Sequence, residues 1–416
     1  MRLGLLFSVF IAMPLAVFAQ SNSNKVQNFS FEAPGTPNEC ADKWVPAWNG
    51  NCSRDYLPAS AGGWDGDYAL KLFGSASGVA GFLQVIELNQ TVYKPLRFDL
   101  QIKGENVQNL ASDKYGAALY CRIYFMDNTT SWCPTTAITK NTGTFDWRHV
   151  GLSISDVPNS FNKLVKKVYF GCIIGAITGI AWCDDMHLTE YDTGIFQGAV
   201  TLMFDDGFIE QRTIAFPEIQ SRGWCGTIAA VWNYLGNGDP EYINLAQLKE
   251  LQVGCWEVVS HGMNHLNMTQ VTPVVMEDEF YWSRRRFHEN GIPVKNFALP
   301  FGAYNAYVLG VNEERGYFKS IRNSNEGYNG VGTFRHLVKV QKVEWNTTAQ
   351  QVGVWLDEAR AQKSWLILMF HKIRVNCLDQ YCVNDNTFRL MLTAVQGSTL
   401  PVVTYDQGLF LVQAVN

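Results

Sequence analysis

The sequence has few charged residues and no excess of basic ones. Charged side chains account for 17% of its 416 residues, and 33 Lys and Arg against 38 Asp and Glu leave a net charge of -5 at pH 7. This balance argues against nucleic acid as a partner, because a polyanion selects a basic surface. A hydrophobic share of 47% also excludes a disordered chain. The length predicts two or three domains, each with its own core.

Long hydrophobic runs are absent beyond the first residues of the chain. The apolar stretch that follows Arg2 ends at Val17-Phe-Ala19, with small residues at the positions that a signal peptidase reads. We therefore predict a signal peptide at residues 1–19, with an uncleaved anchor helix as the alternative. No later segment is long and apolar enough to span a membrane.

A Cys-x-x-Cys pair is also absent, so the cysteine spacing predicts no thiolate zinc site. The ten cysteines are an even number, which an exported chain uses most simply as five disulfides. Six precede residue 192 and four follow it, so each part can pair within itself. The pairing stays open at this stage, and near neighbours are the simplest choice: Cys40–Cys52, Cys121–Cys133, Cys172–Cys183, Cys225–Cys255 and Cys377–Cys382.

The first part of the chain, from about residue 28 to 190, has short strand-like segments and no long amphipathic helix. Examples are Tyr68–Phe73, Leu96–Ile102, Ala118–Phe125 and Lys167–Cys172, each bounded by Gly, Asn or Pro. Strands at this density without helices between them predict an antiparallel β-sandwich or jelly roll.

After Tyr191 the pattern changes to strands that alternate with helices. Gly198–Phe204 is a buried strand, and Asn244 and Thr272 are candidate N-caps of the helices that follow. Alternating β and α elements predict a parallel α/β barrel or a doubly wound sheet. We place the boundary between residues 190 and 197, giving domains at 20–192 and 193–416, and we expect the second to fold and act alone.

Polar residues follow three of the predicted strands of the second domain. Asp205 and Asp206 come after Phe204, His261 and His265 after Val259, and His371 after Phe370; the chain has only seven histidines. The carboxyl ends of parallel strands converge on one face, so these side chains can meet. Two His at i and i+4 share one side of a helical turn, and one carboxylate would complete a three-ligand zinc set. Each set also has a structural alternative. Asp205 and Asp206 can belong to a turn or cap a helix, His261 and His265 can be a surface or hydrogen-bonded pair, and His371 can be a core histidine.

Four motifs stand in order along this domain, and together they resemble a known family. They are Met203-Phe-Asp-Asp-Gly207, His261-Gly-Met-Asn-His265, Pro300-Phe-Gly302 and the strand Leu366–Phe370 that ends in His371. Residues 198 to about 410 are similar to the polysaccharide deacetylase domain, also called the NodB homology domain, of carbohydrate esterase family 4. The resemblance implies a distorted α/β barrel.

The same resemblance implies a role for each matching residue. Asp206, His261 and His265 would hold a divalent metal, most simply Zn²⁺, with Co²⁺ or Ni²⁺ as alternatives. Asp205 would be the general base and His371 the general acid. The backbone N–H of Phe301 would donate a hydrogen bond to the oxyanion.

Two parts of the family pattern are missing. Ala298 stands where an Arg often opens the third motif, and the Asp and Trp of the fourth motif are not evident between Tyr317 and Glu326. Arg322 is our candidate for the missing guanidinium. The missing residues would influence the orientation and the proton affinity of Asp205 and His371. They do not include a metal ligand.

The first domain resembles carbohydrate-binding modules of the family 4/9 type. Val26–Glu32, Gly66–Leu72 and Ile180–Leu188 carry the likeness. It implies a structural Ca²⁺ near Glu32 and Asp185, for which ordinary strand-end capping is the alternative. Aromatic rings that stack on sugars are expected in loop-like sequence, at Trp44, Trp48, Trp64 and Trp132, rather than at Trp147 or Trp182. For each of them a place in the core is the alternative.

Together these features predict a function. We expect a secreted, monomeric, metal-dependent deacetylase of the cell exterior or cell wall. It would hydrolyse linear amides by removing N-acetyl groups from a chitin-like or other N-acetylglucosamine-containing glycan. An esterase of O-acetylated xylan and an inactive glycan-binding protein are the alternatives. We expect no nucleic acid partner, and no membrane span after removal of the signal peptide.

Overall fold

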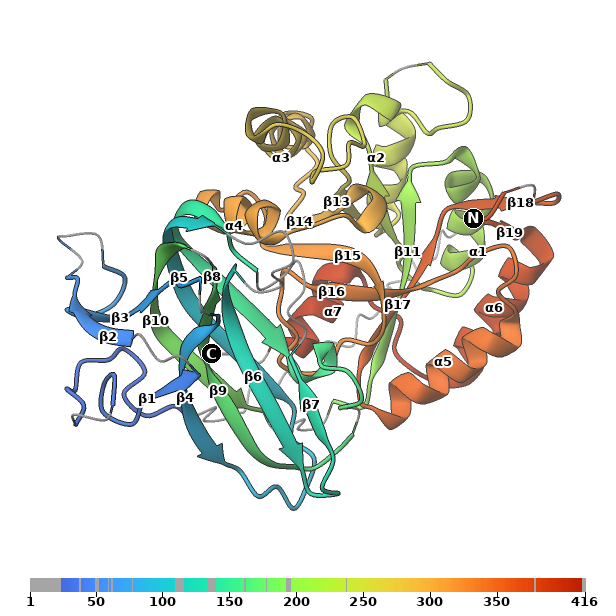
Figure 1. Ribbon diagram of the computed structural model, residues 1–416. Coiled ribbons are helices and arrows are strands. Elements are labelled where there is room, and N and C mark those ends of the chain that lie inside the picture. Colours follow the sequence, from blue (N-terminus) through green and yellow to red (C-terminus); the bar gives the residue numbers. More distant parts are fainter. Residues whose placement is uncertain are drawn as a thin grey trace, which may run out of the picture.

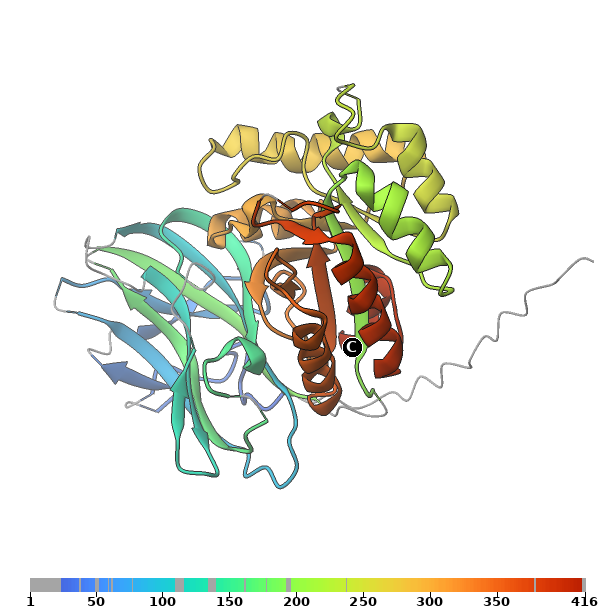
Figure 2. The same cartoon turned by 90° about the vertical axis from the view of Figure 1, so that its right-hand side faces the viewer.

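The computed structural model describes residues 24–413 with short gaps. The parts outside the description are 1–23, 37–38, 49–51, 59, 61–62, 77, 109–115, 134–139, 161, 177, 192–195, 237, 378 and 414–416. The predicted signal peptide thus lies outside the described residues. We call residues 24–191 the first domain and 196–413 the second, and the two lie side by side in Figure 1 and Figure 2. None of the helices in the described part is long and apolar enough to cross a membrane.

The first domain consists of two five-stranded antiparallel sheets with one shared core. One sheet has the order β1-β4-β9-β6-β7 and the other β2-β3-β10-β5-β8. Their strands are β1 (Val45–Trp48), β2 (Cys52–Tyr56), β3 (Tyr68–Phe73), β4 (Ala80–Glu87), β5 (Leu96–Gln108), β6 (Gly116–Phe125), β7 (Thr130–Trp132), β8 (Gly143–Ser153), β9 (Val165–Gly175) and β10 (Thr178–Glu190). Alternate side chains such as Leu70 and Leu72 point inward, and the rings of Phe98 and Phe170 meet between the sheets with centroids 5.8 Å apart.

The segment Val26–Glu32, which resembled an N-terminal strand, forms turns instead. Asn28 and Phe31 adopt φ angles of 50° and 61°, which lie outside the strand region. The Asn28 side chain donates to the carbonyls of Ala33 and Asp42 at 3.0 Å, which holds the turn.

The second domain is built on a closed parallel barrel of seven strands. They are β11 (Ala199–Asp206), β12 (Thr227–Ala230), β13 (Glu257–Ser260), β14 (Asn296–Ala298), β15 (Ser320–Glu326), β16 (Val338–Lys342) and β17 (Trp365–Phe370). Closure excludes the doubly wound alternative and confirms the barrel. Inside it, Met203, Val259, Ala298, Val340 and Met369 pack together, so the residue two positions later on each strand also faces inward.

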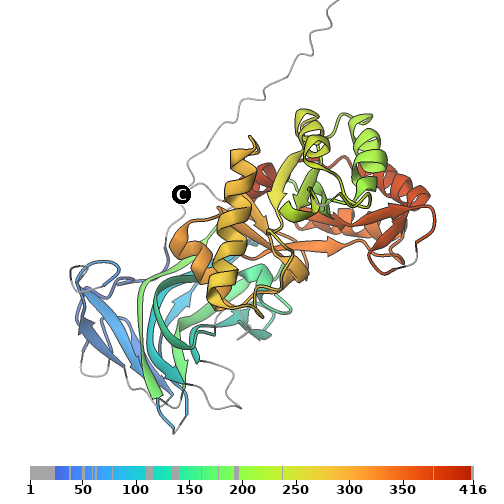
Figure 3. The ribbon, with the colours of Figure 1, turned by 90° about the horizontal axis from the view of Figure 1, so that it is seen from above.

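Helices cover the outside of the barrel, as Figure 3 shows from above. They are α1 (Phe216–Gln220), α2 (Leu245–Val253), α3 (Pro273–Glu289), α4 (Ala306–Arg315), α5 (Ala349–Ala361) and α6 (Asp385–Ser398). The last helix, α7 (Tyr405–Val412), instead packs Tyr405, Leu409 and Val412 against the inward-facing side chains of the barrel. Both predicted N-caps are confirmed: the Asn244 side chain accepts from the N–H of Gln247 and the Thr272 side chain from that of Val275. The short β18 (Lys372–Arg374) and β19 (Cys382–Asn384) pair beside the barrel.

Four of the five predicted disulfides are present, namely Cys40–Cys52, Cys172–Cys183, Cys225–Cys255 and Cys377–Cys382. The fifth prediction is wrong, because Cys121 and Cys133 are buried free thiols. They face each other on neighbouring strands, but the sulfur of Cys133 accepts from the backbone N–H of Cys121 at 2.7 Å instead of bonding to its sulfur.

Paired charges join the two domains. Arg148 Nε of β8 donates to Glu314 Oε1 of α4 at 3.2 Å, and Lys339 Nζ of β16 lies 2.5 Å from Asp156 Oδ1. Lys339 is only 8% exposed, so removal of the first domain would leave its ammonium without this partner. The contact therefore argues against the expectation that the second domain folds and acts alone.

A buried histidine at this contact predicts how stability depends on pH. His149 Nε2 lies 3.2 Å from Asp99 Oδ1 of the first domain, and its Nδ1 lies 3.8 Å from Glu313 Oε1 of the second. Burial alone would lower the pKa of His149, but the two carboxylates raise it to about 9. Because folding raises the pKa of His149, its protonated imidazole stabilises the folded protein. This stabilisation is complete below the pKa of the unfolded state, about 6.5, and is lost as the pH rises through about 9.

We therefore expect the melting temperature to fall between pH 6.5 and 9.5, and to fall less steeply in His149→Gln. The slope will not vanish in the variant, because Asp99 also raises the pKa of His187. Calorimetry of both proteins across this range measures the two slopes, and parallel slopes would contradict the assignment.

Candidate active site

The six predicted site residues line one cavity of about 340 Å³, and they are Asp205, Asp206, His261, His265, Phe301 and His371. It lies at the carboxyl ends of β11, β13 and β17, where parallel barrels place their functional side chains (Figure 1). Residues up to 166 positions apart in the sequence thus meet at one mouth of the barrel.

Three of these residues form a compact group of donor atoms. Asp206 Oδ1 lies 3.5 Å from His261 Nε2 and 3.3 Å from His265 Nε2, and all three ligand atoms lie within 4.8 Å of one another. Among the described residues this is the one such group of His, Cys, Asp or Glu. Ligands about 2 Å from a tetrahedral Zn²⁺ are themselves roughly 3.3 Å apart, so the spacing suits a metal.

The two histidines come together in a loop rather than on the helical turn that their spacing suggested. Gly262 and His265 have φ angles of 86° and 58°, and the imidazole centroids lie 4.8 Å apart. A Cβ at Gly262 would approach Glu279 Oε2 to 2.6 Å, so this position requires glycine for space as well as for φ.

A buried carboxylate that the sequence did not indicate holds this loop. Glu279 of α3 is 1% exposed, and its Oε2 accepts from the backbone N–H groups of Met263 and Asn264 at 2.9 and 3.1 Å. Its Oε1 accepts from the Asn264 side chain at 2.7 Å. Glu279 therefore fixes the backbone between the two histidines.

The protonation states of the donor group favour metal binding. Burial alone would raise the pKa of Asp206, but the nearby imidazoles of His261, His371 and His265 lower it to about 2. Burial and the neighbouring His261 lower the pKa of His265 to about 4. Near neutral pH the carboxylate is ionised and this imidazole is neutral, which are the forms that ligate a metal.

Hydrogen bonding also fits a metal at this point. His261 Nδ1 lies 2.8 Å from the carbonyl of Ala298, which leaves Nε2 directed at the donor group. The buried Asp206 Oδ1 has no hydrogen-bond partner among the described residues. A bound cation would satisfy this oxygen, so the residues present fit a divalent metal.

Arg322 supplies the guanidinium that the third motif lacks. Its Nη2 donates to Asp205 Oδ2 at 2.5 Å, and the two residues are 1% and 2% exposed. It stands on β15, next to β14, whose Ala298 holds the usual Arg position. The other oxygen, Asp205 Oδ1, has no hydrogen-bond partner in the described structure and can accept one from a ligand.

His371 completes the group from the end of β17. Its ring lies 5.1 Å from that of Tyr381, and both line the cavity. Gln211 Nε2 donates to the backbone carbonyls of Asp205 and His371 at 2.5 and 3.0 Å, which ties the ends of β11 and β17 together. Gln211 could not be identified from the sequence, because its side chain contacts backbone atoms.

Phe301 stands beside the donor group on a strained backbone. Its φ is 58°, a value that a non-glycine residue adopts at a cost. Its ring is 65% exposed and lies 4.6 Å from that of His265. Such strain often accompanies a function, and here it sets the main chain of the Pro300-Phe-Gly302 motif at the cavity.

Glu32 and Asp185, the two predicted calcium ligands, do not belong to a group of three or more potential metal ligands among the described residues. Glu32 Oε1 accepts from the N–H groups of Asp67 and Tyr68 at 2.9 and 3.0 Å, while Asp185 Oδ1 lies 3.4 Å from His187 Nε2. The contacts of Glu32 are those of a strand-end cap, and the calcium site stays a prediction.

Three of the four tryptophans expected in loops are exposed: Trp48, Trp64 and Trp132 are 53%, 47% and 49% accessible. The fourth expectation is wrong, because Trp44 is fully buried against Phe31 and Phe82. Its Nε1 donates to the carbonyl of Asn28, so a core site satisfies its polar atom.

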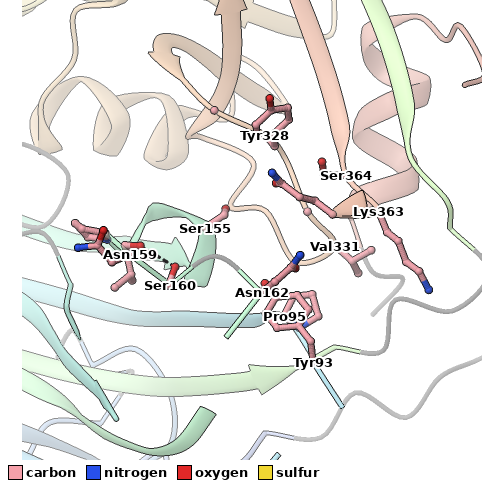
Figure 4. Close-up of a pocket in the computed structure, with 15 residues that line it drawn as sticks. Tyr93, Pro95, Ser155, Asn159, Ser160, Asn162, Tyr328, Val331, Lys363 and Ser364 are labelled. Atoms are coloured by element: carbon pink, nitrogen blue, oxygen red, sulfur yellow. Dashed lines mark hydrogen bonds between the residues drawn. The ribbon is translucent and has the colours of Figure 1, made fainter. Parts of the chain in front are cut away.

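A second cavity, of about 360 Å³, lies between the domains (Figure 4). Tyr93, Pro95 and Asn162 line it from the first domain, and Tyr328 and Lys363 from the second. It contains none of the six predicted site residues, so the chemistry indicated by the sequence belongs to the cavity at the barrel mouth.

Comparison with known proteins agrees with the motifs. Residues 196–318 match the family model described as polysaccharide deacetylase. YxkH of Bacillus subtilis (strain 168), provisionally named a polysaccharide deacetylase, is 26% identical over 122 residues, which are 28% of this chain and 42% of that protein. The chain thus spans less than half the length of this curated relative.

Solved structures with similarity include the deacetylase PplD of Streptococcus pyogenes in complex with acetate, at 22% identity and a TM-score of 0.32, covering 34% of this chain and 63% of that one. Another is BA3943 of Bacillus anthracis, described as a family 4 carbohydrate esterase pseudoenzyme, at 14% identity and a TM-score of 0.36, covering 52% and 67%. By the match of the family model, residues 196–318 in the barrel half of this chain are similar to a polysaccharide deacetylase domain.

Proposed function

We propose that this protein is a secreted, metal-dependent deacetylase that removes N-acetyl groups from a chitin-like or other N-acetylglucosamine-containing polysaccharide. The observation that carries the proposal is the meeting of the Asp206, His261 and His265 donor group with the Asp205–Arg322 pair and His371 in one cavity. A protein that only binds glycan needs neither a buried carboxylate with a free oxygen nor a histidine beside it. Four disulfides support secretion.

Asp206, His261 and His265 would hold the metal, most simply Zn²⁺. When bound, a divalent cation of this kind acts as a Lewis acid and lowers the pKa of water. Three protein ligands leave room at such a site for substrate and water. Glu279 keeps the two imidazoles in place through the loop backbone.

The other residues would move protons and position the acetyl group. Asp205 accepts the proton of the attacking water at its free Oδ1, while Arg322 fixes the carboxylate through Oδ2. The N–H of Phe301 donates to the carbonyl oxygen as negative charge develops on it. His371 delivers a proton to the departing amine, which is a poor leaving group without one.

Acetate release from a panel of substrates tests the proposal. The panel contains N-acetylglucosamine oligomers, acetylated xylan, and the same glycans without acetyl groups. We expect release from the N-acetylated oligomers. Release from xylan alone would favour the O-acetyl esterase, and no release from any substrate by metal-loaded protein would favour an inactive glycan-binding protein.

We further propose that residues 20–192 are a jelly-roll glycan-binding module. An aromatic surface on the outer side of one sheet supports this. The ring of Trp48 lies 4.8 Å from that of Tyr120, which in turn lies 6.0 Å from that of Trp132. A Cβ at Gly81 would lie 2.9 Å from the Trp48 ring, so glycine makes room for the ring to lie on the sheet. Such rings stack on the apolar faces of sugars.

Trp48→Ala and Trp132→Ala should each weaken binding of the full chain to insoluble chitin about 10-fold, because buried aromatic anchors dominate such interfaces. Co-sedimentation measures the affinity. Trp282→Ala is a matched control, since Trp282 is an exposed tryptophan of the second domain and should leave the affinity unchanged. Equal affinities in all four proteins would identify the first domain as a spacer.

A further inference from the structure

One charged side chain at the mouth of the barrel has no role in the proposed reaction. Lys342 ends β16 and lines the same cavity as the catalytic candidates. It stands two residues after Val340, whose side chain packs inside the barrel, so Lys342 also faces inward. Asp205, His261 and His371 occupy the same place at the ends of their own strands, two residues after Met203, Val259 and Met369.

The surroundings of Lys342 differ from those of the other cations in the cavity. Arg322 is paired with Asp205, and Lys372 Nζ lies 2.9 Å from Asp379 Oδ2. The ammonium of Lys342 has no ion pair or hydrogen bond among the described residues, although it is partly shielded from solvent. The nearest acidic residue along the strand, Glu344, accepts instead from the Gln380 side chain at 2.8 Å.

An unpaired cation in a substrate cavity attracts an anion. Three acidic residues line the cavity, and each has another partner: Arg322 for Asp205, the donor group for Asp206 and the Gln380 side chain for Glu344. None of them pairs with Lys342. A hydrogen bond between Lys342 and an ionised group of the substrate should discriminate between substrates by roughly 10-fold.

We propose that Lys342 is a specificity residue that binds a carboxylate carried by a sugar next to the acetylated one. The substrate class would then be an acidic glycan in which N-acetylated sugars alternate with carboxylate-bearing ones. This inference rests on the proposed deacetylase function and narrows its substrate. Released acetate is a second source of the same carboxylate chemistry, and the experiment separates the two.

The test compares two soluble hexasaccharides, one of N-acetylglucosamine alone and one in which N-acetylglucosamine alternates with glucuronic acid. The quantity measured is the ratio of kcat/KM per acetyl group, acidic over neutral. Wild type should favour the acidic substrate, Lys342→Gln should lower the ratio about 10-fold, mainly through KM, and Lys342→Arg should keep it. Added salt should shrink the wild-type ratio, because it screens a partly exposed charge.

Lys249→Gln is the matched control for net charge, since Lys249 is an exposed residue of α2 outside the cavity. It should leave the ratio at its wild-type value. A ratio that Lys342→Gln does not lower, or a wild-type enzyme that cleaves only the neutral substrate, overturns the inference and leaves the deacetylase proposal standing. Weaker inhibition by acetate in Lys342→Gln at an unchanged ratio would assign the lysine to product, which also overturns it. No cleavage of either substrate by wild type would sink both proposals.

Discussion

Asp205→Asn should lower kcat by about 10²-fold or more, while the metal content stays near one ion per chain. Asparagine keeps the shape of the side chain but cannot accept a proton from water. Asp205 lies beside the donor group of Asp206, His261 and His265, with its Oδ2 4.0 Å from His261 Nε2, but does not belong to it. The loss of its carboxylate should therefore separate catalysis from metal binding. Steady-state kinetics and elemental analysis of the same preparations measure both quantities.

Asp205→Asn also leaves the buried Arg322 without its ionised partner, and a variant of Arg322 is therefore compared with it. Removal of one partner from a buried ion pair costs about 3–5 kcal/mol, so Asp205→Asn should also unfold at a lower temperature than wild type. Arg322→Lys keeps the positive charge but loses the planar fork, and we expect a smaller fall in kcat with metal retained. A folded Asp205→Asn protein with kcat within a few-fold of wild type would rule out Asp205 as the base.

His261→Gln should remove both the metal and the activity. Glutamine is close in polarity but offers no imidazole nitrogen, and the two remaining protein ligands are too few for a stable catalytic site. We expect metal content to fall from about one to about a tenth of an ion per chain or less, with acetate release falling in proportion.

His288→Gln is the matched control for this loss. His288 lies on α3 outside the cavity, and its Nε2 contacts the carbonyl of Val294 at 3.0 Å. This variant should bind metal and release acetate as wild type does. Full metal content in His261→Gln, or equal losses in both variants, would contradict the ligand assignment.

Strand ends were the part of the site that the sequence predicted best. Asp205, His261 and His371 each follow an apolar run, and the convergence of parallel strands brings them together whatever the loops do. The loop from His261 to His265 could not be predicted in the same way, because its geometry depends on Glu279 of another helix and on the positive φ angles of Gly262 and His265.

Contacts between side chains that are far apart in the sequence could not be predicted either, because they depend on how neighbouring elements pack. Arg322 was proposed only because the usual guanidinium was missing, and its contact with Asp205 depends on the neighbouring positions of β14 and β15. Gln211 acts through backbone carbonyls and leaves no pattern in the sequence. In the first domain, the polar surroundings of Trp44 in the sequence concealed its place in the core, since Asn28 satisfies its indole N–H.

Metal titration of the wild-type protein tests the central claim most directly. Verified metal-free protein is mixed with increasing Zn²⁺, and acetate release from an N-acetylglucosamine oligomer is followed at each ratio. The account predicts no release without metal, a linear rise, and a break at one equivalent per chain. Release from the metal-free chain at the rate of the loaded one would contradict it.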